Sequence, residues 1–274
     1  MRIVTFSRNG RIQHGTRDGG LVRVHPSATS AVDLAIHPAL HPVGEEVALA
    51  DVTLLSPVPS PGKIICIGLN YRAHAMEGGF AIPDYPAVFM RCTTSLAEPG
   101  SDLLLTDCSD QFDFEAELAI VIGRRATRVG AAALDHVAGY SCFNDGSIRD
   151  YQRKSTQWTM GKNFDRTGAF GPDLVTADEL PPGAAGLRIQ SRLNGKVMQD
   201  SDTTDMIFDA AALVSVLSEA MTLEPGDVIA AGTPSGVGYA RKPPVFMRAG
   251  DRIEIEIERI GTLSNTVAAP RVRS

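Results

Sequence analysis

The stretch at residues 113–123 restricts the fold most, because it is apolar on both faces of an extended strand. With the two-residue period of a strand, positions 114, 116, 118, 120 and 122 are apolar on one face, and positions 119 and 121 on the other. The second face begins with Asp113, Glu115 and Glu117. Because a buried carboxylate needs a compensating positive charge, these acids are either structurally paired or functional. The local pattern alone favours neither.

Composition excludes several classes of protein. The 274 residues include 26 Lys and Arg against 32 Asp and Glu, a net charge of −6, which argues against a general nucleic-acid partner. No apolar run approaches the roughly 20 residues of a membrane span, and the N-terminus lacks the apolar core of a secretory signal. We therefore expect a cytoplasmic enzyme with no membrane partner.

Three prolines within residues 56–62 indicate an extended linker. We expect a small N-terminal domain at residues 1–56 and a catalytic domain at residues 57–274. Histidines at positions 14, 25, 37 and 41 stand beside Pro and Gly in the smaller domain, which favours surface loops over metal ligands.

Strand patterns dominate the larger domain. They cover residues 63–68, 188–193, 228–231 and 252–257, and Asn194-Gly195 is a strong hairpin signal. Helical spacing is clearest over residues 207–221. The balance predicts an α+β fold, mainly β, rather than a doubly wound sheet.

A third carboxylate makes a functional role for the acidic strand more plausible. Asp145 follows the strand-like run at residues 139–143, and strand ends commonly supply ligands. Three carboxylates that converge without a cation would repel one another. With no His or Cys nearby in sequence, the oxygen-rich set favours Mg²⁺ or Mn²⁺ over Zn²⁺.

The order and spacing of several weak motifs between residues 62 and 268 together resemble the fumarylacetoacetate hydrolase family. The motifs are His74-Ala75-Met76-Glu77 within residues 67–77, Phe114-Glu115-Ala116-Glu117-Leu118, Asn144-Asp145 followed by Arg149-Asp150, Gly161-Lys162-Asn163-Phe164-Asp165, Asn194-Gly195 with Gln199, and Gly232-Thr233-Pro234-Ser235-Gly236-Val237-Gly238.

The resemblance implies a mixed β-sandwich roll with a small N-terminal domain, usually as a homodimer. It also implies a role for each matching residue. The implied metal ligands are Glu115, Glu117 and Asp145, the implied catalytic residues are His74, Glu77 and Lys162, and the implied substrate-binding residues are Arg149, Gln152 and Thr233. The segment after His74 resembles a mobile lid, and Gly78-Gly79 would give it hinge-like freedom.

Two positions depart from the family pattern. Arg91-Cys92 stands where many members have Lys-Pro, and a planar guanidinium is no simple substitute for an ammonium group, so a substrate contact there would be altered. Gly146 stands where relatives more often carry a larger residue, which would widen the pocket.

The resemblance points to three functions. The leading hypothesis is a metal-dependent hydrolase that cleaves a carbon–carbon bond in a 2,4-dioxo acid (acylpyruvate-like) or a related catabolic intermediate, with His74 activating water. The alternative is an isomerase, tautomerase or decarboxylase of a 2-oxo acid at the same site. A non-catalytic, metal-stabilised binding protein is the third, and the presence of His74, Glu77 and Lys162 argues against it.

Overall fold

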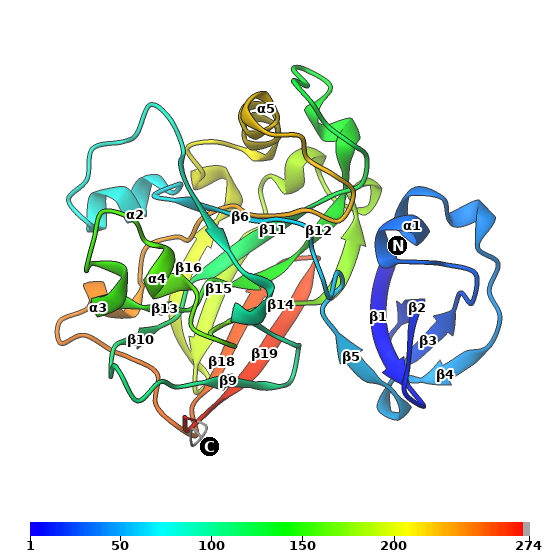
Figure 1. Ribbon diagram of the computed structural model, residues 1–274, viewed down its shortest axis with the longest axis horizontal. Coiled ribbons are helices and arrows are strands. Elements are labelled where there is room, and N and C mark those ends of the chain that lie inside the picture. Colours follow the sequence, from blue (N-terminus) through cyan, green and yellow to red (C-terminus); the bar gives the residue numbers. More distant parts are fainter. Residues whose placement is uncertain (271–274) are drawn as a thin grey trace.

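A large mixed β-sheet carries the acidic strand near its middle. The computed structural model describes residues 1–270, and within them twelve strands form this sheet (Figure 1). They are β1 (Arg2–Arg8), β2 (Arg11–Asp18), β3 (Leu21–Val24), β4 (Glu46–Ala48), β5 (Thr53–Leu55), β6 (Ile64–Gly68), β7 (Ala87–Arg91), β8 (Leu96–Ala97), β11 (Ala116–Ile122), β12 (Val137–Asn144), β14 (Gly168–Thr176) and β17 (Val228–Ala230). The order is β4-β3-β2-β1-β14-β12-β11-β17-β6-β7, with β5 beside β1 and β8 beside β14.

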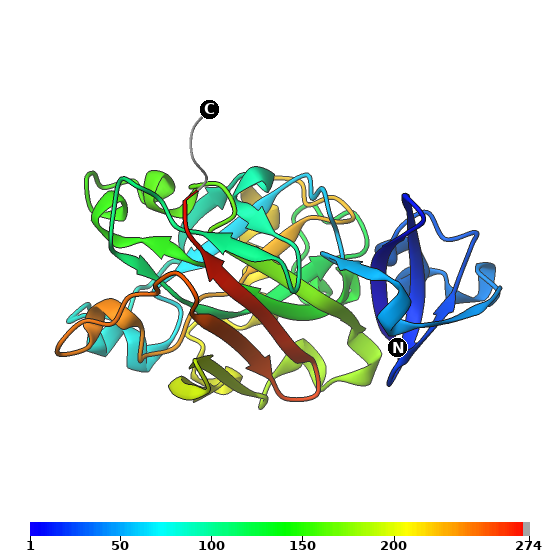
Figure 2. The same cartoon turned by 90° about the horizontal axis from the view of Figure 1, so that it is seen from below.

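A second sheet faces the first and completes a sandwich (Figure 2). Its order is β16-β15-β18-β19-β9, and a separate two-stranded sheet pairs β10 with β13. The bounds are β9 (Asp102–Leu104), β10 (Phe112–Asp113), β13 (Ser147–Ile148), β15 (Arg188–Leu193), β16 (Lys196–Asp202), β18 (Arg252–Ile257) and β19 (Gly261–Ala268). The expected hairpin joins β15 to β16, with positive φ angles of 52° at Asn194 and 78° at Gly195.

Strand β11 is buried on both faces, as its sequence predicts. Leu118 and Ile120 belong to the core shared with β15, β18 and β19, whereas Ala119 and Val121 belong to a second cluster that includes Leu34. Each fully buried Leu or Ile contributes roughly 1.5–3 kcal/mol. The predicted class, α+β and mainly β, is confirmed, and the acidic end of β11 is held by packing from both sides.

The helices are short and lie outside the sandwich core. They are α1 (Ala31–Ile36), α2 (Arg72–Glu77), α3 (Arg149–Gln152), α4 (Thr159–Lys162) and α5 (Ala210–Ala220). The last begins later than expected because the Asp209 side chain accepts the Ala212 N–H and caps it. Within residues 1–270 no helix has the length and apolar character needed to cross a bilayer.

The N-terminal strands form a lobe at one end of the molecule (Figures 1 and 2). The lobe has its own small core, which includes Phe6 and Val22, and β1 continues the large sheet through β14. The proposed division at residue 56 falls just after β5. The expectation of surface histidines was wrong for His14, His25 and His41, which are buried in this lobe.

Asp173 on β14 links the N-terminal lobe to the sandwich. Its buried carboxylate pairs with Arg2 at 3.3 Å and Arg17 at 3.1 Å. We expect Asp173→Ala to lower the free energy of unfolding by about 1–2 kcal/mol, because two guanidinium groups lose a partner. The exposed pair of Arg188 and Asp200 gives a matched control, and Asp200→Ala is expected to cost less than about 0.5 kcal/mol. Equal costs in urea unfolding would contradict a linking role for Asp173.

Candidate active site

The register of β11 and β12 brings the three predicted carboxylates together. Ala116 pairs with Asn144, so the residues beside them, Glu115 and Asp145, meet where the two strands end. The Asp145 N–H donates to the Glu115 carbonyl at 3.0 Å. All three acids, Glu115, Glu117 and Asp145, are buried, and each offers an oxygen within 4.8 Å of the others.

Three basic side chains compensate part of this negative charge, and one of them, Arg91, pairs with Asp145 at 2.6 Å. The Lys162 ammonium, at the end of α4, lies 2.5 Å from Glu115 Oε2 and 2.6 Å from Asp145 Oδ2. Arg149, at the start of α3, lies 2.6 Å from Glu115 Oε1. Burial raises the pKa of the Glu115 carboxyl, but Arg149 and Lys162 outweigh it and bring that pKa to about 2. Burial alone would lower the pKa of Lys162, yet Asp145 and Glu115 raise it.

Glu117 has no ion-pair partner among residues 1–270, in contrast to Glu115. Its Oε2 accepts only the Gly232 N–H, at 3.0 Å. Burial raises the pKa of Glu117 well above its usual range, and the carboxylates of Asp145 and Glu115 raise it further. A buried, uncompensated carboxylate beside two others fits a divalent cation, and an all-oxygen donor set suits Mg²⁺ or Mn²⁺.

His74 and Glu77 face each other on α2. His74 Nδ1 lies 3.2 Å from Glu77 Oε2, and the other Glu77 oxygen accepts the Gly236 N–H at 2.9 Å. Burial would raise the pKa of Glu77, but the hydrogen bonds with His74 and Gly236 lower it. Because Nδ1 meets a carboxylate, it carries the proton, and Nε2 is left able to accept one.

Arg149 is anchored by an acid whose role the sequence left open. Its Nε donates to Asp113 Oδ2 at 2.8 Å, and Asp113 also accepts the N–H groups of Gly238 and Tyr239. Arg149 Nη1 donates to Gln152 at 2.9 Å, whereas the buried Nη2 has no partner in the described chain. The Nε and Nη1 groups of Arg149 are therefore fixed by hydrogen bonds, and Nη2 remains able to donate to an anionic ligand.

Thr233 is held beside the same site by Gln199. The Gln199 amide donates to the Thr233 hydroxyl at 2.7 Å, and its carbonyl oxygen accepts the Ala116 N–H at 3.0 Å. This bridge ties the glycine-rich loop to the start of β11.

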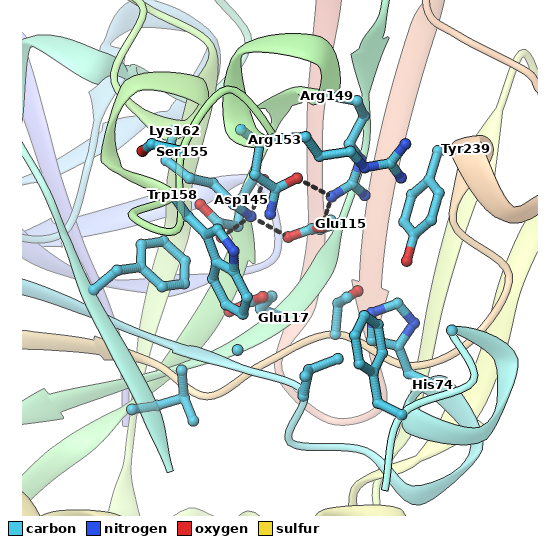
Figure 3. Close-up of a pocket in the computed structure, with 18 residues that line it drawn as sticks. His74, Glu115, Glu117, Asp145, Arg149, Arg153, Ser155, Trp158, Lys162 and Tyr239 are labelled. Carbon is cyan, nitrogen blue, oxygen red and sulfur yellow. Dashed lines mark hydrogen bonds and ion pairs between the residues drawn. The ribbon is translucent and has the colours of Figure 1, made fainter. Parts of the chain in front are cut away.

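These groups line one cavity of about 420 Å³. Figure 3 shows His74 across the cavity from Asp145 and Lys162. All nine predicted site residues lie in this region, and eight of them line the cavity: His74, Glu115, Glu117, Asp145, Arg149, Gln152, Lys162 and Thr233. The ninth, Glu77, contacts the cavity through His74.

The cavity also contains residues that the motifs did not mark. Phe80, Phe89, Arg153, Trp158 and Tyr239 lie in its wall. The Trp158 ring packs edge-on against Phe89, with ring centroids 5.6 Å apart. The predicted lid after His74 stays a prediction, although Phe80 from that segment reaches the cavity.

The two departures from the family pattern have a structural explanation. Arg91 is not in the cavity wall, because its guanidinium is buried against Asp145 Oδ1 at 2.6 Å and donates to the Gly146 carbonyl at 3.0 Å. Gly146 does not widen the cavity either, since a Cβ there would lie 2.0 Å from the Thr167 carbonyl oxygen. Thr167 in turn accepts from Arg91 at 3.1 Å. Arg91 and Gly146 therefore belong to one buried group of contacts that holds Asp145 in place.

Comparison with known proteins agrees with this geometry. Residues 63–268 match the family model for the fumarylacetoacetate (FAA) hydrolase C-terminal domain, and residues 1–57 match the Rv2993c-like N-terminal model. The chain belongs to the fumarylacetoacetate hydrolase family. The expected homodimer stays a prediction.

Relatives in this family carry several activities. The chain is 44% identical to oxaloacetate tautomerase YisK of Bacillus subtilis and 42% identical to mitochondrial oxaloacetate tautomerase FAHD2A of Bos taurus. Each match covers 80% of this chain, and 74% and 70% of the relative.

Solved structures from the family superpose closely. A 5-carboxymethyl-2-hydroxymuconate delta-isomerase from Mycobacterium smegmatis gives a TM-score of 0.83 at 34% identity, with 98% of this chain and 100% of that one covered. A fumarylacetoacetate hydrolase from Exiguobacterium antarcticum gives 0.85 at 34% identity, with 98% and 99% covered. The relatives therefore favour isomerisation or tautomerisation over the leading prediction of carbon–carbon hydrolysis.

Glu117→Gln tests the uncompensated carboxylate. We expect the variant to unfold in EDTA at a temperature no lower than the wild type, because the amide replaces a carboxyl whose charged form burial and two neighbouring carboxylates already disfavour. Mg²⁺ or Mn²⁺ should stabilise the wild type by about 2.7 kcal/mol at a hundredfold excess over Kd, and the variant far less.

Thermal unfolding with and without the metal measures both effects. Glu254→Gln, on a half-exposed strand face, provides the control and should change neither. An equal metal-induced shift in Glu117→Gln and wild type would contradict the assignment of Glu117 as a ligand.

Proposed function

We propose that this protein is a divalent-metal-dependent tautomerase or isomerase of a 2-oxo acid, with oxaloacetate as the first substrate to test. The proposal rests on the named activity of relatives that are 42–44% identical, together with the His74–Glu77 pair facing the carboxylate cluster. Glu115, Glu117 and Asp145 would hold Mg²⁺ or Mn²⁺, which supplies Lewis-acid polarisation of the 2-oxo group when bound.

His74 is the proposed residue for proton transfer. Toward the enol, tautomerisation removes a proton from carbon 3 of the 2-oxo acid and adds one to the carbonyl oxygen. Toward the keto form the two transfers are reversed, and in both directions the mass of the substrate stays the same. His74 Nε2 is the accepting atom, because Nδ1 is held by Glu77. Glu77 stabilises the imidazolium and fixes the ring toward the cavity.

The basic residues bind and orient the substrate. The Nη2 of Arg149, which has no partner among the described residues, would donate to the substrate carboxylate, with Gln152 beside it. The buried Lys162 ammonium stabilises negative charge that develops on the substrate oxygen during proton removal. Thr233, held by Gln199, would contribute a hydroxyl from the loop that follows β17.

The test is the decay of enol oxaloacetate, followed by its ultraviolet absorbance with Mg²⁺, Mn²⁺ or EDTA. We expect acceleration that EDTA abolishes, and a loss of about 10²–10⁴-fold in kcat for His74→Asn, since one general base is removed. Glu77→Gln should lower kcat less, because it acts through His74.

His37→Asn is the matched control, because His37 is exposed in the N-terminal lobe, and it should leave the rate unchanged. Mass spectrometry of 2,4-dioxo acids under the same conditions separates the competing hydrolase. Two fragments from a dioxo acid, with no acceleration of oxaloacetate tautomerisation, would contradict the proposal.

A further inference from the structure

Arg153 places a second guanidinium at the rim of the cavity. It follows α3 directly, four residues after Arg149, and its N–H donates to the Arg149 carbonyl at 3.3 Å. Residues four apart in a helical turn share one face, so both side chains extend toward the same region. Arg153 is exposed and lines the cavity, whereas Arg149 is buried deeper.

Tyr239 positions both guanidinium groups. The central carbons of Arg149 and Arg153 each lie 4.5 Å from the centre of the Tyr239 ring, so they are separated by no more than twice that distance. Stacking on an aromatic ring restricts a flexible arginine and leaves its N–H edge free. The Tyr239 backbone is itself fixed, because its N–H donates to Asp113 at 2.9 Å.

The two arginines differ in their acidic partners. Arg149 forms ion pairs with Asp113 and Glu115, but no carboxylate of the described residues forms an ion pair with Arg153. An arginine edge that faces a cavity without an acid partner is suited to bidentate binding of a carboxylate from a ligand. In the proposed function, Arg149 already binds the carboxylate next to the 2-oxo group, so Arg153 is available for a second carboxylate.

We propose that Arg153, stacked on Tyr239, binds a second carboxylate of the substrate and makes the enzyme selective for 2-oxo dicarboxylic acids over 2-oxo monocarboxylic acids. This inference rests on the proposed function of the same cavity. It assigns Arg153 a role in substrate selection and none in proton transfer.

The experiment compares two substrates of equal chain length. Oxaloacetate carries the second carboxylate, whereas 2-oxobutanoate has a methyl group in its place. Exchange of the carbon-3 hydrogens for deuterium, measured by NMR above the uncatalysed rate, reports proton removal from both. We expect Arg153→Met to raise KM for oxaloacetate by about 10- to 100-fold, because one charged hydrogen-bonding pair with the substrate is lost. The value of kcat should be nearly unchanged. Turnover of 2-oxobutanoate should change less than about threefold.

Lys154→Met is the matched control for charge. Lys154 is the next residue, its ammonium lies 3.2 Å from the centre of the Tyr151 ring, and it does not line the cavity. Loss of this charge should alter neither substrate. Arg153→Lys, which keeps the charge but loses the planar fork, should give an intermediate KM for oxaloacetate.

The outcomes separate the inference from the proposed function. Equal losses on both substrates in Arg153→Met, or no loss on oxaloacetate, would overturn the role of Arg153. If the wild type accelerates neither reaction, the tautomerase proposal fails. The affinities of oxaloacetate and 2-oxobutanoate, measured by calorimetry with Mn²⁺, then still test the inference. The wild type and Lys154→Met should bind oxaloacetate more tightly than 2-oxobutanoate, and Arg153→Met should lose this preference.

Discussion

The site depends on one constraint, which is that three carboxylates are buried close together where β11 begins and β12 ends. Glu115, Glu117 and Asp145 are buried and line the same cavity, so water screens their repulsion less than it would at the protein surface. Lys162 and Arg149 pair with Glu115, Lys162 and Arg91 pair with Asp145, and no basic side chain among residues 1–270 pairs with Glu117. The fold thus places excess negative charge at one point, where a divalent cation could bind.

Around this cluster lies a layer of residues that fix the ligands without facing the cavity. Arg91 donates to Asp145, Ser95 and Thr167 from a fully buried guanidinium. Asp113 fixes Arg149 and, through backbone N–H groups, the turn that carries Tyr239. Rigid support of this kind places charged groups before the substrate arrives, so little reorganisation is needed during reaction.

The sequence alone predicted those features of the fold that depend on neighbouring residues. The two-faced burial of β11 and the hairpin at Asn194-Gly195 came directly from residue pattern. The three carboxylates were marked by the residue pattern, the other six site residues came from the family resemblance, and the structure brings the nine together. Contacts between distant segments could not be foreseen. Arg91 and Asp145 are 54 positions apart, and Asp113 and Gly238 are 125 apart, with no periodic signal between them. The residue pattern could not separate a tautomerase from a hydrolase, because both reactions would use the same metal site and the same base.

The most direct test of the metal centre is the anomalous scattering of Mn²⁺ in a crystal of the full chain. The account predicts one peak at roughly 2.0–2.2 Å from an oxygen of each of Glu115, Glu117 and Asp145, with the Lys162 ammonium displaced from its bridging position. A peak elsewhere, or saturating Mn²⁺ with Lys162 still bridging Glu115 and Asp145, would contradict it.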